Sequence, residues 1–144
     1  MPQTNFEKIV DFHKALEDTP STPTPPSSDT LALRRTLIQE EFYEVMAAFE
    51  ALTANGTADL APLAHELADL LYVVYGTFAT LGVNADAVYA EVHRANMDKL
   101  GGPRREDGKL LKPPGWQPAD VNGVLAQLQA NQPHTAVPEE NTHA

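Results

Sequence analysis

Two stretches decide the fold: Ile38-Gln-Glu-Glu-Phe-Tyr-Glu-Val-Met-Ala-Ala-Phe-Glu-Ala-Leu52 and Leu60-Ala-Pro-Leu-Ala-His-Glu-Leu-Ala-Asp-Leu-Leu-Tyr-Val-Val-Tyr75. In both, apolar residues recur every three or four positions, which is the spacing of one face of an α-helix. Asn55-Gly56 ends the first helix, and Asp59 is placed to cap the second. Pro62 falls in the first turn of that second helix, where its missing N–H is harmless. The sequence therefore predicts two long helices facing each other.

The rest of the chain predicts shorter helices and no strand. The long pair is expected from Ser28 or Asp29 to about Ala54 and from Asp59 to Gly82. Further helices are expected over 5–17, from Asn84 to about Leu100, and over a last amphipathic segment near 121–128. A proline-rich linker (18–28) and a basic loop (101–118) separate them. We predict one all-α domain over 1–130, a bundle of about five helices, and a disordered tail over 131–144.

Composition excludes several classes of protein. The chain of 144 residues has no cysteine, which removes thiol catalysis and zinc–thiolate sites. Its N-terminus lacks the features of a signal peptide, and no apolar run reaches the length of a membrane span. A net charge of −10 argues against nucleic-acid binding. We expect a soluble, cytoplasmic protein that binds neither nucleic acid nor membrane.

Acidic side chains stand where the long helices should be apolar. On a wheel of 100° per residue, Glu41 and Glu66 fall inside the apolar arcs of their helices, and Glu44 and Asp69 lie at the edges. Ionised carboxylates converging in a buried place need compensation. Pairing with a basic residue is the alternative, but no Lys or Arg occurs in residues 36–93. A hard divalent cation, Mg²⁺ or Mn²⁺, prefers such oxygen ligands, so the pattern predicts a metal site.

The basic residues are concentrated in one segment. Six of the ten fall between positions 94 and 112, where only three acidic residues occur. A local basic segment in an acidic protein can bind a small anion, although a solvated loop would show the same composition.

These motifs resemble a known family. Glu40-Glu41-Phe-Tyr-Glu44, followed by Glu66-Leu-Ala-Asp69, is similar to the motif of the all-α nucleoside triphosphate pyrophosphohydrolases, the MazG-like enzymes. The resemblance covers about residues 6–125 and includes Asp11-Phe12-His13, His93 to Lys99, and the loop through Trp116. The stretch Leu60 to Tyr72, followed by His93 to Asn96, resembles the MazG-like branch that hydrolyses dUTP.

The resemblance implies cleavage between the α and β phosphates of a nucleoside triphosphate, giving a nucleoside monophosphate and pyrophosphate. It assigns the Mg²⁺ ligands to Glu41, Glu44, Glu66 and Asp69. Glu40 matches the acid that orients or deprotonates the attacking water. It gives the basic segment the task of holding pyrophosphate, through Lys99, Arg104, Arg105, Lys109 and Lys112. Family members usually form dimers, so we expect a homodimer that completes the bundle.

Candidate nucleoside contacts are Phe12, His13 and Asn96. For His13 a satisfied position in the core is an equal alternative, and for Asn96 helix packing or capping is one. Among nucleotides we expect dUTP, with dCTP and modified deoxynucleotides left open.

Two other kinds of protein compete with this interpretation. A ferritin-like di-metal carboxylate protein needs Glu-x-x-His on two helices, and this chain has none. A non-catalytic helical interaction module would leave the inward positions of Glu41 and Glu66 unexplained.

Overall fold

A computed structural model describes residues 1–55 and 59–131. Within these residues the chain forms five helices and no strand, in the order α1 (Asn5–Leu16), α2 (Ser28–Asn55), α3 (Ala61–Thr80), α4 (Ala85–Met97) and α5 (Val121–Ala130). The all-α prediction is confirmed. The tail predicted to be disordered lies, apart from Asn131, outside the described residues.

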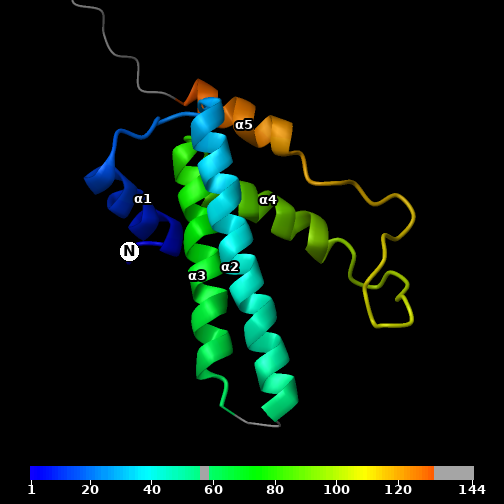
Figure 1. Ribbon diagram of the computed structural model, residues 1–144. Helices are drawn as coiled ribbons and strands as arrows, with labels where there is room; N and C mark the ends of the chain where they lie inside the picture. Colours follow the sequence, from blue (N-terminus) through cyan, green and yellow to red (C-terminus); the bar gives the residue numbers. More distant parts are fainter. Residues whose placement is uncertain (56–58, 132–144) are drawn as a thin grey trace, which may run out of the picture.

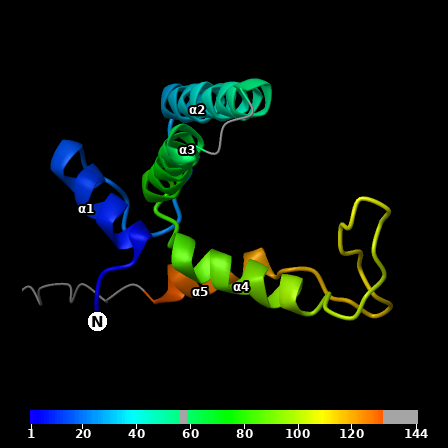
Figure 2. The same ribbon diagram turned by 90° about the horizontal axis from the view of Figure 1, so that it is seen from below.

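The long helices α2 and α3 form an antiparallel hairpin, which is the main axis of the molecule (Figure 1). Val45 of α2 is only 2% exposed. Helix α1 packs on α3, while α4 and α5 pack together as a separate arm (Figure 2). The hairpin therefore has one flank covered by α1, and the arm extends away from its upper end.

The small core lies where α1, α3 and α4 meet. Phe6, Ala79 and Ala85 are buried there, with Val10 and Phe78 packed around them. The chain turns sharply at this point, because Gly82 adopts a φ of +67° after the last turn of α3. A Cβ on Gly82 would lie 2.1 Å from the carbonyl oxygen of Thr22 in the proline-rich linker, so only glycine fits.

Local hydrogen bonds explain where the helices begin. Thr4 and Glu7 form a capping box at α1, and the Asn84 and Asp120 side chains accept from backbone N–H groups of α4 and α5. The cap of α2 is Ser27, which accepts from the Thr30 N–H at 3.2 Å, so the prediction of Ser28 or Asp29 was one or two residues late.

Two other predicted boundaries also shift. Leu60 occupies the cap position of α3, although the Asp59 carboxylate accepts a hydrogen bond from the Ala61 N–H. Helix α4 ends at Met97 rather than near Leu100, because the N–H groups of Lys99 and Leu100 bond three residues back instead of four. This tighter turn leads into Gly101, whose φ is +84°.

Large apolar side chains remain exposed along the hairpin. Phe42 and Phe49 of α2 are 46% and 45% exposed, and Met46 lies between them on the same side of the helix. Leu67 and Leu71 of α3 are also exposed. The apolar stripe predicted for the long helices is thus only half covered within one chain.

No single helix in the described ranges is long and apolar enough to cross a membrane. Only α3 and α4 taken together meet that length and composition, and they are bent by 113°.

Candidate metal centre

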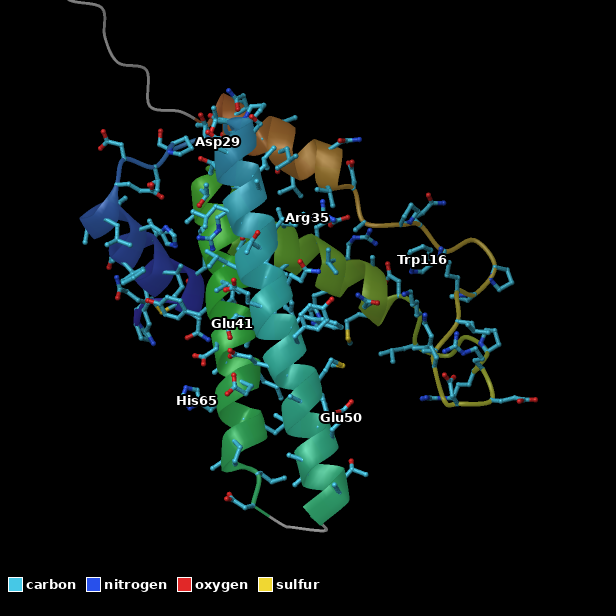
Figure 3. The ribbon with its side chains drawn as sticks, in the orientation of Figure 1. Asp29, Arg35, Glu41, Glu50, His65 and Trp116 are labelled. Atoms are coloured by element: carbon cyan, nitrogen blue, oxygen red, sulfur yellow. The ribbon has the colours of Figure 1, made fainter. Side chains whose placement is uncertain are left out.

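The predicted carboxylates converge at the middle of the α2–α3 hairpin. Glu41 comes from α2, and Glu66 and Asp69 come from α3. One oxygen of each lies within 4.8 Å of the others, which is close enough for a shared cation. Figure 3 shows Glu41 where α2 faces α3. The hairpin brings the ligands together because each helix offers them one turn apart on its inner side.

Glu44 joins this cluster from the next turn of α2. It lies outside the group of three converging ligands, but its negative charge is near enough to raise the pKa of both Glu41 and Glu66. All four predicted ligands therefore belong to one group of interacting acids.

Burial and mutual repulsion disfavour the ionised forms. Burial, then Glu44 and Asp69, raises the pKa of Glu41. Burial, then Glu44, also raises the pKa of Glu66. One oxygen of Glu41 and one of Glu66 are buried without a hydrogen-bond partner. Orphaned oxygens of this kind are what a hard cation satisfies, so the residues present fit a divalent metal.

Glu40, the candidate base, and His65 both lie beside this group of acids. Glu40 is exposed on α2 and lies outside the three-residue ligand group. His65 of α3, which was not among the predicted site residues, has its Nε2 3.2 Å from Asp69 Oδ2 while remaining 72% exposed. It can therefore orient that carboxylate. The spacing of four residues in His65-Glu-Leu-Ala-Asp69 was the signal for this contact.

Arg34 is a buried charged residue that joins the two long helices, and the sequence did not reveal it. It is only 8% exposed, and its Nη2 donates to the Val73 carbonyl at 2.8 Å while Nε donates to Thr77 Oγ1 at 3.1 Å. These bonds tie α2 to α3 beyond the carboxylates. Gly76 makes room for the guanidinium, because a Cβ there would lie 2.6 Å from Arg34 Nη2.

The three residues predicted to contact the nucleoside lie in two separate parts of the structure. Phe12 of α1 meets Tyr72 of α3 in an edge-to-face contact with ring centroids 5.5 Å apart. His13 is 6% exposed against Gly76, and burial, then Arg34, lowers its pKa. Asn96 lies on α4, where it donates to the Val92 carbonyl and accepts from Lys99. A single chain therefore does not bring Asn96 to the α1 candidates.

A pocket of about 310 Å³ opens between α1 and α3. Lys8 and Ile9 line it from α1, and Leu71, Tyr72 and Tyr75 line it from α3. Because Tyr72 follows Asp69 by less than one turn, this aromatic pocket adjoins the carboxylate cluster.

The basic segment follows α4 and lies away from the hairpin. Arg105 is paired with Asp107, and Arg104 donates to the Gly108 carbonyl. Lys99 and Lys112 both lie against the ring of Trp116. Lys109 forms no ion pair among the described residues.

The fold and the site define an all-α protein whose two central helices carry a carboxylate centre suited to a divalent cation. Residues 9–96, more than half of the chain, match the phosphoribosyl-ATP pyrophosphohydrolase family. The chain belongs to this family, which is part of the MazG-like all-α nucleoside triphosphate pyrophosphohydrolase superfamily. It is a family of pyrophosphohydrolases that act on nucleotide-like substrates, and divalent metals are typical of the superfamily. No individual curated protein matches the chain significantly.

Proposed function

We propose that the protein is a Mg²⁺-dependent pyrophosphohydrolase that converts dUTP and water into dUMP and pyrophosphate, removing unwanted nucleotides from the pool. One observation carries this proposal: Glu41, Glu66 and Asp69 converge with orphaned buried oxygens, inside the region that matches the pyrophosphohydrolase family. A hard cation held by these carboxylate oxygens would in turn bind the oxygens of a phosphate chain.

The residues divide the chemistry between them. Glu41, Glu44, Glu66 and Asp69 would hold the cation, which supplies charge neutralisation for the triphosphate and activates water; Mn²⁺ has the same ligand preference. Glu40 stands beside this group and takes the proton of the attacking water. The water oxygen forms a new P–O bond as the α–β anhydride bond breaks, and pyrophosphate leaves. Basic residues of the 101–118 loop and Lys99 stabilise that leaving anion.

The nucleoside is proposed to lie against α1. Phe12 and His13 stand on the helix that flanks the carboxylates, and the aromatic pocket beside Tyr72 offers a surface for a base. The preference for uracil rests on the similarity of the motif neighbourhood to dUTP-hydrolysing enzymes.

A product assay tests the proposal. The protein is incubated with Mg²⁺ and, separately, each deoxynucleoside triphosphate, dUTP and phosphoribosyl-ATP, and the products are separated by anion exchange. Monophosphate and pyrophosphate are expected, with dUTP the fastest substrate. Diphosphate and inorganic phosphate would contradict the cleavage position, whereas faster hydrolysis of phosphoribosyl-ATP would replace dUTP as the substrate.

Three variants of one helix separate the roles of its acids. Glu41→Gln should abolish turnover and metal binding, and Glu40→Gln should keep metal binding but lose rate. Glu50→Gln is the matched control, because Glu50 is exposed on the same helix and lies outside the cluster (Figure 3). A normal rate in Glu40→Gln would remove its role as base.

We also propose that the protein is a homodimer. Large apolar side chains are exposed on both long helices, Phe42, Met46 and Phe49 on α2 and Leu67 and Leu71 on α3, and a second copy of the chain could cover them. Light scattering should give twice the mass of the chain, and a fully active monomer would refute the proposal.

A further inference from the structure

His13 is a buried, titratable side chain at the place where α1 meets the α2–α3 hairpin. It is 6% exposed, and its Nε2 lies 2.6 Å from the point where a Cβ on Gly76 would stand. Nη2 of Arg34 lies 2.6 Å from the same point, so the imidazole of α1 and the guanidinium of α2 approach each other over this glycine of α3. We call His13, Arg34 and Gly76 the histidine latch. Three helices therefore meet at one titratable group.

The latch fits a neutral imidazole better than a charged one. Arg34 is 8% exposed and forms no ion pair within the described ranges, so its positive charge is buried without a counter-ion. Nδ1 of His13 is buried without a hydrogen-bond partner. A proton added to the ring would place a second positive charge beside Arg34, which is unfavourable in a buried place.

Two charged groups act on His13, and they oppose each other. Arg34 faces it from α2, and Glu17 lies one turn further along α1, whereas α3 faces it with the uncharged Gly76. Glu17 Oε1 is 3.9 Å from Nδ1, which is too long for a hydrogen bond, and the Glu17 side chain is 60% exposed to the screening of water. Burial, then Arg34, therefore outweighs Glu17 and lowers the pKa of His13.

The position of α1 determines the shape of the pocket beside the carboxylates. Lys8 and Ile9 line that pocket from α1, and Tyr72 lines it from α3. Phe12 connects the latch to the pocket, because its ring meets the His13 ring edge to face at 5.6 Å and the Tyr72 ring at 5.5 Å. A tilt of α1 would therefore change the pocket.

Hydrogen bonds on either side of α1 hold its ends without involving the latch. Thr4 Oγ1, just before the helix, donates to Asp86 of α4 at 2.6 Å. In the linker after the helix, the Thr24 N–H donates to the Leu81 carbonyl at 2.9 Å. Figure 1 shows α1 on the outer flank of α3, joined to α2 by that linker. Helix α1 can therefore tilt between two tethered ends without leaving the fold.

We propose that the histidine latch holds α1 against α3 while His13 is neutral, and that protonation of His13 tilts α1 away from α3 and widens the pocket. Imidazole is the side chain that gains its charge just below neutral pH. The closed position favours the neutral form, so the latch holds at pH 7 and above and weakens as the pH falls below about 6.5. One proton changes the ratio of tilted to closed α1 by at most about tenfold per pH unit. The latch is independent of the proposed function, which determines only what enters the pocket.

Two spin labels measure the tilt directly. The chain has no cysteine, so Ala15→Cys on α1 and Glu50→Cys on α2, both at exposed positions, give a specifically labelled pair. Electron paramagnetic resonance should find one distance between the labels at pH 7.5 and a second, growing population between pH 6.5 and 5.5. A distribution that stays unchanged down to pH 5.5 would refute the latch.

Variants of the labelled protein assign the tilt to the latch. His13→Gln cannot gain the charge and should keep one distance at every pH. Arg34→Met removes the repelling charge, so the tilted fraction at pH 5.5 should fall several-fold relative to wild type. His93→Gln, which removes an exposed histidine of α4, is the matched control and should behave as wild type does. A tilt that persists in His13→Gln, or that is unchanged in Arg34→Met, would overturn the proposal.

Circular dichroism at pH 7.5 checks that each variant is folded, and if one of the two latch variants does not fold, the other decides. The catalytic consequence is measured separately. If the protein hydrolyses dUTP as proposed, its KM should rise more steeply below pH 6.5 in wild type than in Arg34→Met, because the triphosphate titrates equally in both. Equal KM profiles beside a measured tilt would refute the link between latch and pocket. A protein that hydrolyses no nucleotide refutes the proposed function, and the distance measurement still decides the latch.

Discussion

Gly76→Ala tests whether close contact with Arg34 holds the two ligand-bearing helices together. The new Cβ would lie 2.6 Å from Arg34 Nη2 and 2.6 Å from His13 Nε2, whereas ordinary contact begins near 3.4 Å. The guanidinium must therefore retreat by about 0.8 Å. That movement stretches its bond to the Val73 carbonyl from 2.8 Å to a length that no longer counts as a hydrogen bond.

The magnitude follows from two opposing effects. Losing a hydrogen bond from a charged donor costs about 1.5 to 3 kcal/mol, whereas replacing a helical glycine with alanine stabilises by about 1 kcal/mol. We expect a net loss of about 0.5 to 2 kcal/mol, which lowers the Tm of a 144-residue chain by about 1 to 8 °C. The loosened hairpin should also bind Mg²⁺ more weakly.

Thermal and urea denaturation measure this loss, and a double-mutant cycle with Arg34→Ala assigns it. If the guanidinium is the obstacle, Gly76→Ala should be less harmful in the Arg34→Ala background, with a coupling of about 1 kcal/mol. A Gly76→Ala protein as stable as wild type would refute the reasoning, because helix propensity would then outweigh the contact.

Three further predictions concern charged groups. Without metal, Glu41→Gln should raise the Tm, because it removes a carboxyl group whose pKa is raised by burial and by the neighbouring acids. With Mg²⁺, the wild type should have the higher Tm in a melting experiment. Hydrogen bonds from Arg94 lower the pKa of Glu91 to about 2, so Glu91 stabilises the fold above pH 4.5 and loses this effect as the pH falls toward 2. The stability gap between wild type and Glu91→Gln should close over that window in acid titrations, and a constant gap would contradict it. The pKa of His13 is lowered, so α1 should become less protected from hydrogen exchange as the pH falls below about 6.5, and unchanged protection would exclude the burial of a neutral imidazole.

The candidate metal ligands were predictable because the helical spacing of apolar residues, and the acids that interrupt it, can be read directly from the sequence. Glu41 and Glu66 interrupt apolar arcs at helical spacing, and the structure places them at the α2–α3 contact where those arcs meet. Helix ends were predictable only to within a few residues. Ser27 rather than Ser28 caps α2, because several polar residues in a row can each offer an oxygen and the chain path selects one.

Contacts between segments that are far apart in the sequence could not be predicted from the spacing of apolar residues. Arg34 looks like an ordinary charged residue near the start of α2, and its burial depends on Gly76 lying opposite it, 42 positions later. His13 was open to two interpretations, and the structure places it beside the same glycine. A helical wheel describes one helix at a time, so it cannot show which other helix packs against a given face.

The sequence by itself determined the class of fold, the two ligand-bearing helices and the four acids that they present, because spacing along a helix is a local property. Only the tertiary structure decided that Arg34 ties the helices together and that Trp116 collects two lysines away from the carboxylates. These features depend on the direction in which the chain leaves each helix. That direction is set by turns and by packing between elements, which no local pattern of residues contains.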